Sequence, residues 1–291
     1  MKQVFLVILL AFGFVVGAQN KIVKKPKKQK PATTQVAPKK HKSQSKPTKG
    51  GTVKRVATKA SYSNGTLTVN GIKYNMVWVD GGTFRMGATS EQGSEISDEK
   101  PVHSVTLSGY YIGKTEVTQA LWQAVMGSNP SYFEGDDLPV EQVSWDDCQE
   151  FIRKLNSLTG QNFRLPTEAE WEFACRGGNN SRGYKYSGSN YIDNVAWYDG
   201  NSGDKTHPVA TKSPNELGIY DMSGNVWEWC ADWYGDYSSG RQTNPKGPYG
   251  GSYRVYRGGS WFIYARFCRS SFRISSDPSF RGYFLGLRLA L

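Results

Sequence analysis

Residues 164–172 read Arg-Leu-Pro-Thr-Glu-Ala-Glu-Trp-Glu, and this stretch predicts a short helix near the middle of the chain. Thr167 and Glu170 form a capping box, in which the hydroxyl and the carboxylate satisfy free backbone N–H groups at a helix start. Apolar residues follow within 171–174, and Arg-Gly-Gly at 176–178 ends the element. The pattern therefore predicts one short helix that begins after Thr167.

Two further helices are predicted upstream of this stretch. Ser144 and Asp147 form a second capping box, and apolar residues then recur at helical spacing up to Gly160. This register places Cys148 on the core face. Another helix is expected at 118–126, where a threonine can cap the start and a glycine follows the end.

The strands come first in the folded part. Two β-rich runs, 66–69 and 72–79, flank Asn70-Gly71, a strong signal for a two-residue hairpin turn. Beyond Gly178 periodicity is weak, which predicts long ordered loops on a small sheet. Tryptophans in these loops either pack internally or stack on a sugar or another ligand. They are Trp197, Trp227, Trp229, Trp233 and Trp261.

The N-terminus has the features of a secretory signal peptide, residues 1–18, with cleavage expected near Ala18. The alternatives are a buried helix or an uncleaved anchor. A signal peptide implies a secreted, periplasmic or cell-surface protein. The domain itself is expected at 61–291, where 38% apolar and 13% aromatic residues in the whole chain suffice for a core.

The charge is unevenly distributed. Residues 21–60 contain 14 Lys and Arg and no acid, whereas 21 basic and 25 acidic residues give 61–291 a net charge of −4. We therefore expect 19–60 to be a flexible basic linker. In a secreted protein its contacts would be anionic envelope polymers or lipid headgroups, or it is a solvated spacer. No nucleic acid is expected as a partner.

Four cysteines lie in the expected domain: Cys148, Cys175, Cys230 and Cys268. An oxidising compartment would allow two disulfides in any of three pairings, and buried free thiols are the alternative. The cysteine spacing matches no zinc motif, and His103 and His207 stand apart, so a zinc site is not expected.

Several motifs occur together in this chain, and in order they resemble the formylglycine-generating enzyme, or sulfatase-modifying factor, family over about residues 74–291. They lie at 76–87, 114–118, 164–172, 224–229 and 257–261. The resemblance implies an α+β, C-type lectin-like fold with a small twisted antiparallel sheet, few helices and long ordered loops. A fold does not by itself imply an activity.

The same resemblance implies structural Ca²⁺ in two loop sites, and a mixture of carboxylate and carbonyl oxygens suits that ion. The alternative is that the acids hydrogen-bond the loop backbone without metal. The implied ligands are Asn194, Val195, Asp221, Gly224, Val226 and Glu228.

The oxidase chemistry of the family is implied only in part. The family's enzyme binds copper through two cysteines five residues apart, and the matching positions here are Ile263 and Cys268. One thiolate does not reproduce that soft-ligand site, so no copper and no catalytic residue are expected. Cys268 is then a core thiol or a disulfide partner, with Cys230 as the candidate.

The C-terminal segment carries a second resemblance. Around Arg257-Gly-Gly-Ser-Trp261, Arg266 and Cys268-Arg269 it resembles variable regions diversified by retroelements that mutate template adenines. Fifteen positions contain none of the residue types, Lys, Glu, Gln, Met or Trp, that this route excludes. They are Phe262, Ile263, Tyr264, Phe267, Ser271, Phe272, Ile274, Ser275, Ser276, Asp277, Ser279, Phe280, Gly282, Tyr283 and Phe284.

These fifteen positions are the predicted ligand-binding residues, because seven of them are rings in a segment broken by Gly and Ser. The nearby arginines, at 266, 269, 273 and 281, can brace the surface or engage acidic partners. The first hypothesis is a protein or glycan receptor that displays about 262–284. The alternatives are a formylglycine-generating enzyme and a structural component of the envelope or a secretion machinery.

Overall fold

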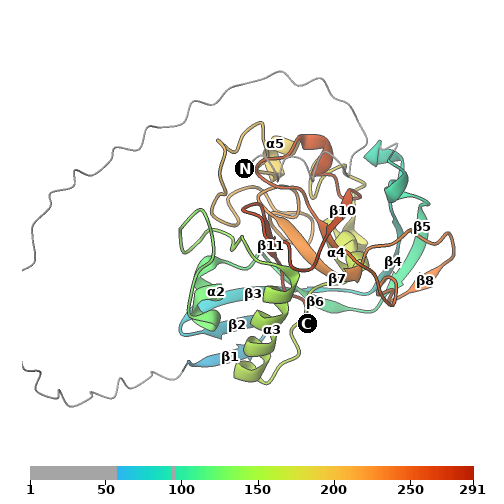
Figure 1. Cartoon of the computed structure of the whole chain (residues 1–291). Helices are drawn as coiled ribbons and strands as arrows, with labels where there is room; N and C mark the ends of the chain where they lie inside the picture. The colour runs from blue at the N-terminus through green and yellow to red at the C-terminus, as the bar shows by residue number, and fades with distance from the viewer. Residues whose placement is uncertain (1–57, 94–95) are drawn as a thin grey trace, which may run out of the picture. The chain divides into compact units, whose positions relative to one another are not determined.

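The computed structural model describes residues 58–93 and 96–291, which belong to one compact unit (Figure 1). The predicted signal peptide, and all but the last three residues of the predicted linker, lie outside the described residues. Within them, no helix is long and apolar enough to cross a membrane.

Three small sheets make up the β structure. Their strand orders are β1-β2-β3-β6, β10-β9-β7-β11 and β4-β5-β8. The strands are β1 Ala60–Ser63, β2 Thr66–Val69, β3 Ile72–Val79, β4 Gly82–Met86, β5 His103–Leu107, β6 Tyr110–Gly113, β7 Trp227–Trp233, β8 Gln242–Thr243, β9 Arg254–Arg257, β10 Arg273–Ser276 and β11 Leu285–Leu287.

The single antiparallel sheet of the sequence analysis is thus replaced by three sheets with two parallel pairs, β11 with β7 and β5 with β8. The β11–β7 pair forms because the end of the chain returns to the sheet that contains β7. After β11, Ala290 bridges both Ile112 and Arg164. The C-terminus therefore connects the first sheet to the loop that precedes the helix at 168–175. Local sequence patterns do not encode such a long-range pairing.

The helices agree with their capping signals. They are α2 Gln119–Met126, α3 Trp145–Thr159, α4 Glu168–Cys175 and α5 Ile192–Val195, with 3₁₀ turns η1 Ser90–Gln92, η2 Ser97–Glu99, η3 Gly178–Asn180 and η4 Ala265–Phe267. Both predicted capping boxes are present, at the starts of α3 and α4. Cys148 is buried on the core face of α3. The short α5 was not predicted, since four residues carry no periodic signal.

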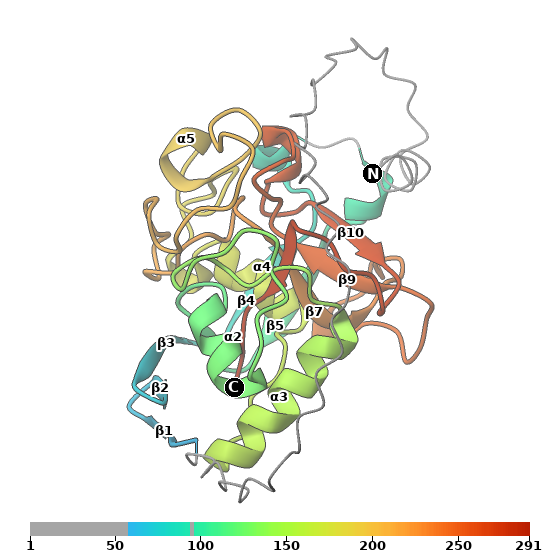
Figure 2. The same ribbon diagram turned by 60° about the vertical axis from the view of Figure 1, so that its left-hand side comes forward.

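The predicted hairpin is also present. β2 and β3 pair in antiparallel register from Val69 opposite Ile72, and the turn between them is Asn70-Gly71. Both turn residues have positive φ, 50° and 89°, which Asn and Gly adopt at low cost. α2 and α3 lie against this first sheet, as Figure 2 shows.

Tryptophan packing accounts for much of the loop region. Trp227, Trp229 and Trp261 are buried, and the last two donate their indole N–H to the backbone oxygens of Val143 and Tyr283. Trp197 is half-buried and stacks on the His207 ring at 3.7 Å. These rings supply local cores for the loops, as the packing interpretation predicted.

All four cysteines are buried free thiols. The suggested Cys230–Cys268 pairing is therefore wrong for this structure. Cys230 lies in the main core with Trp171, whereas Cys268 lies in a separate cluster with Tyr186 and Val195. The two thiols therefore lie in different hydrophobic clusters, and the spacing of the cysteines in the sequence does not reveal this separation.

Candidate functional site

The C-terminal segment, residues 257–287, runs from the end of β9 through η4 and β10 to β11. In both Figure 1 and Figure 2, η4 lies beside α5, at the end of the domain away from β1. Cys268 packs against Val195 of α5, which is consistent with that placement. One side of the segment, called here the held side, is bound to the rest of the domain by buried ion pairs. The other, called the open side, carries partly exposed aromatic rings.

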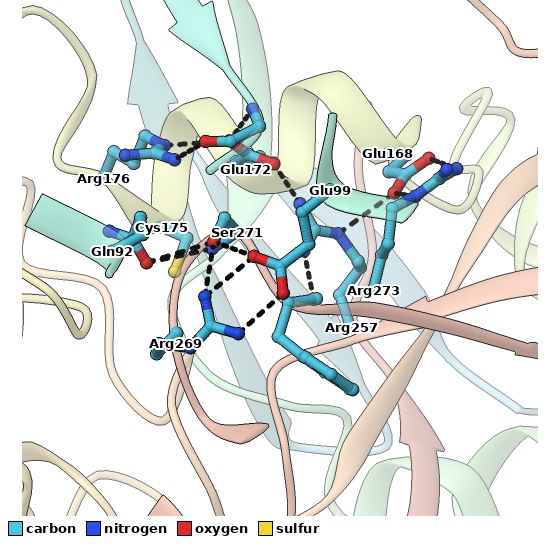
Figure 3. A network of polar contacts seen from close by, with 12 residues as sticks. Gln92, Glu99, Glu168, Glu172, Cys175, Arg176, Arg257, Arg269, Ser271 and Arg273 are labelled. Atoms are coloured by element: carbon cyan, nitrogen blue, oxygen red, sulfur yellow. Dashed lines mark hydrogen bonds and ion pairs between the residues drawn. The ribbon is translucent and has the colours of Figure 1, made fainter. Parts of the chain in front are cut away.

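The held side consists of arginines that pair with buried glutamates (Figure 3). Arg269 binds Glu99 of η2 with both terminal nitrogens, at 2.8 and 2.6 Å. Arg273 of β10 binds Glu168 of α4 through two bonds of 2.7 Å. All four side chains are almost completely buried, so each charge depends on its partner.

Arg257, at the end of β9, completes this held side. It bonds to the carboxylate of Glu172 and to the backbone oxygen of Phe272, and its Nε lies 3.3 Å from Glu168. Glu168 and Glu172 are one turn apart on α4. The stretch at residues 164–172 thus supplies two of the buried acids that fix the C-terminal segment, and Glu99 of η2 supplies another.

The neighbouring arginines explain how the buried Glu168 remains ionised. Burial alone would raise the pKa of Glu168, but Arg273 and Arg257 outweigh it and lower that pKa below its usual value. Arg176 in turn binds Glu172 at 2.9 Å. The result is a connected set of bidentate and charge-assisted bonds, which hold geometry more tightly than neutral ones.

The fifteen predicted ligand-binding residues divide by exposure. Tyr264, Asp277 and Ser279 are exposed. Eight are half-buried: Phe262, Ile263, Phe267, Ile274, Ser275, Ser276, Phe280 and Tyr283. Four are buried: Ser271, Phe272, Gly282 and Phe284.

The four buried positions shape the surface from beneath. Ser271 hydrogen-bonds within the Glu99–Arg269 pair and to Gln92, so it belongs to the held side. Phe284 stacks under Phe262 at 5.3 Å. In this arrangement a ligand on the outer face would not touch these side chains directly.

The open side is a group of partly exposed rings, called here the aromatic surface: Phe262, Tyr264, Phe267, Phe280 and Tyr283. Their exposure is incomplete because they pack on buried rings beneath, for example Phe267 on Phe272 at 5.0 Å. The guanidinium of Arg266 lies 4.6 Å from the Phe267 ring. The rings thus form a supported apolar surface with a cation on it.

Two rings that were not predicted from the sequence adjoin this surface. Tyr132, from the loop between α2 and α3, is 68% exposed and lies 6.0 Å from Tyr283. Its neighbour Phe133 meets Trp261 edge to face at 5.4 Å. The only local signal was a Tyr-Phe pair in a Gly- and Asp-rich loop, which gives no hint of its distant partner.

The implied calcium ligands fall in two neighbouring loops, with Asn194 and Val195 on α5 and the others at or just before β7. The Asn194 backbone oxygen accepts from Ser213 N, and the Asp221 carboxylate accepts from Ala210 N at 2.7 Å. Among the described residues no group of three or more His, Cys, Asp or Glu is arranged to hold a metal.

Glu228 in particular does not fit a metal site in this arrangement. Arg288 approaches both of its carboxylate oxygens, at 2.6 and 3.0 Å, and the indole N–H of Trp171 donates to one of them at 2.7 Å. Arg288 also donates to the Tyr220 oxygen at 2.8 Å. The guanidinium thus connects both ends of the 220–228 loop, and at Glu228 the geometry favours the alternative in which the acid bonds within the protein without metal.

The two positions that match the oxidase cysteines lie in one apolar cluster. Ile263 packs against the group that contains Cys268 and Tyr186. Burial raises the pKa of the Cys268 thiol to about 12. A thiol that stays protonated and buried is a poor nucleophile and a poor soft-metal ligand, so this geometry favours a packing role.

Comparison with known proteins places this geometry in a wider group. The model of the sulfatase-modifying factor enzyme 1-like domain matches residues 66–291. The chaperone protein LppX of Paenibacillus barcinonensis is 35% identical over 79% of this chain and 92% of its own length. The formylglycine-generating enzyme of Mus musculus is 30% identical over 74% of each chain.

Solved structures agree with the sequence relatives. Variable protein 1 of Treponema denticola superimposes with a TM-score of 0.70 and 38% identity, covering 77% of this chain and 97% of that one. PvdO of Pseudomonas aeruginosa gives 0.63 and 28%, over 74% and 93%. The α+β, C-type lectin-like class expected from the resemblance is thereby confirmed.

Proposed function

Since this chain belongs to the sulfatase-modifying factor enzyme 1-like family, we propose that it uses the family fold to bind a ligand on its C-terminal surface rather than to oxidise a cysteine. The proposed site is the aromatic surface with the half-buried positions around it, within 262–284. The protein acts outside the cytoplasm, secreted, periplasmic or at the cell surface. Its basic N-terminal residues, 21–60, contact anionic envelope polymers or lipid headgroups.

One observation carries this proposal: the C-terminal segment is fixed by buried ion pairs on one side and exposes supported rings on the other. Substitution at Tyr264 or Phe280 would change the surface without touching the pairs of Arg269 and Arg273. A surface that tolerates change while its support does not is what a receptor with a variable region requires. Similarity to the Treponema denticola variable protein supports the same conclusion.

The ligand is proposed to be a macromolecule, because several partly exposed rings and an exposed arginine lie within one segment. Partly exposed aromatic rings supply large contact area at low entropic cost. One relative is named a chaperone, a class of protein that acts on polypeptides. This favours a polypeptide over a glycan as the ligand.

Population sequencing of the locus for residues 257–291 tests the proposal. We expect substitutions at adenine-templated codons of the exposed and half-buried positions. The codons of Arg257, Arg269, Arg273 and Arg288 should not vary, because their side chains hold the fold. A segment that is invariant across the population would contradict the proposal.

The oxidase alternative has its own assay. Purified full chain, loaded with copper under oxygen, would be incubated with a peptide that carries the sulfatase cysteine motif. We expect no aldehyde by mass spectrometry, since Ile263 supplies no thiolate and Cys268 is buried. Aldehyde formation that depends on Cys268 would restore the enzymatic reading.

A further inference from the structure

Tyr132 stands out among the exposed side chains because it is both exposed and fixed. Its ring is 68% accessible and lies against Tyr283 and Phe133. It belongs to the loop between α2 and α3, which is outside the C-terminal segment. A large ring left in water at such a position is favoured at binding surfaces.

Two buried side chains hold this loop in place. One carboxylate oxygen of Glu141 accepts from the backbone N–H groups of Tyr132 and Phe133, at 2.7 and 2.8 Å. Gln119 donates to the Phe133 backbone oxygen at 2.7 Å and accepts from Gly135 N at 3.0 Å. Glu141 and Gln119 are 0% and 1% exposed, so the ring is presented from a rigid support.

Ring contacts join Tyr132 to Tyr283 and Phe262, the nearer part of the aromatic surface. Tyr132 adjoins Tyr283, and Tyr283 lies 6.3 Å from Phe262. The chain then continues from Phe262 through Tyr264 to η4. Tyr132 therefore extends the aromatic surface by one ring that comes from a different part of the sequence.

An exposed cation, Arg266, lies in η4, four residues after Phe262. Arg266 is exposed, and its guanidinium faces the rings of Tyr264 and Phe267 at 5.8 and 4.6 Å. Among the described residues no acid pairs with it. By contrast, Arg281 pairs with Asp147 at 2.6 Å and Arg269 with Glu99.

On the basis of the proposed function, we infer that Tyr132 and Arg266 are the two ends of one docking surface for an extended polypeptide segment that carries apolar side chains and a carboxylate. The apolar side chains lie on the rings between Tyr132 and Phe262, and the carboxylate pairs with Arg266. Charge complementarity selects an acidic partner. Aromatic rings also stack on sugars, so a glycan is the competing occupant that the test below separates from a peptide.

The test uses the full chain and a phage-displayed library of random linear peptides as the probe. Enriched peptides should combine aromatic or aliphatic residues with Asp or Glu. Their affinity, measured by fluorescence polarisation with the synthetic peptide, should fall about tenfold for Tyr132→Ser and for Arg266→Gln. Tyr249→Ser is the matched control, since Tyr249 is fully exposed in the loop between β8 and β9.

The outcomes separate this inference from the proposed function. If Tyr264→Ser weakens peptide binding and Tyr132→Ser does not, the extended surface is wrong and the proposed function stands. If the peptides bind but no substitution within 262–284 alters their affinity, both fail. Enrichment of peptides without acids, no enrichment at all, or binding on a glycan array in place of peptides overturns the inference. Unchanged thermal midpoints establish that each variant is folded.

Discussion

Arg266 and Arg269 are three residues apart, yet one faces solvent and the other is almost fully buried. Arg269 binds both oxygens of Glu99 and also donates to the Arg266 backbone oxygen at 2.7 Å. The Arg266 guanidinium lies over the rings of Tyr264 and Phe267, and no acid among the described residues pairs with it. The same residue type thus serves to fix the segment at one position and to present a charge at the other.

The contrast extends along the whole C-terminal segment. Its buried arginines connect β9 and β10 to acids on α4 and η2, while its rings face outward from the same backbone. A segment built in this way can change its outer side chains at little cost to folding. Under the proposed function, recognition and stability are carried by different residues.

The largest change in stability is expected from Arg269→Met, which tests the contrast between the two arginines. Loss of the guanidinium removes the cation that binds both carboxylate oxygens of the buried Glu99, which should lower the free energy of unfolding by about 3–5 kcal/mol. Urea denaturation followed by tryptophan fluorescence measures it. Arg266→Gln is the matched control, expected to change stability by no more than about 0.5 kcal/mol. Equal losses in the two variants would refute the division into held and open sides.

A smaller, pH-dependent effect is expected at Glu141, which supports the presented Tyr132. Burial raises the pKa of Glu141 from 4.5 to about 7 in the folded state. The folded protein therefore binds a proton that the unfolded chain has already lost, so stability should fall as the pH rises from about 4.5 to 7. After allowance for residual solvation of the carboxyl group, the loss should be about 2 kcal/mol.

The matched variant is Glu141→Gln, which keeps an oxygen acceptor for the loop N–H groups and cannot titrate. Urea unfolding at intervals across this pH range should give a flatter profile for the variant than for the unaltered chain. Parallel profiles would show that Glu141 does not titrate in that window, and that its role is confined to hydrogen bonding.

The smallest effect is expected from calcium chelation. Because Arg288 and Trp171 already engage Glu228, removal of calcium by EGTA should leave the thermal midpoint unchanged.

The substitution Glu228→Gln, by contrast, should lower the thermal midpoint, since Arg288 then loses its buried counter-charge. A midpoint that rises with added calcium and falls with EGTA would show that the loop binds the ion and rearranges around it.

Local patterns were sufficient wherever a short-range rule applied. The capping boxes at Ser144 and Thr167 and the Asn70-Gly71 turn act within four residues, and all three are present. The exposure of the C-terminal aromatic rings was predicted only in part. The number of rings indicated that some of them are exposed, but it did not identify which rings are buried. Phe272 and Phe284 are buried since the outer rings pack over them.

The sequence by itself determined the family fold, the helix starts, the first hairpin and the position of the C-terminal segment. Only the tertiary structure decided which arginines are buried, that Ser271 lies inside an ion-pair network, and that Tyr132 adjoins a segment about 150 residues away. The physical reason is that burial of a charge depends on whether a partner lies within hydrogen-bonding distance. Those partners, such as Glu99 for Arg269, come from distant segments that only the folded chain brings together.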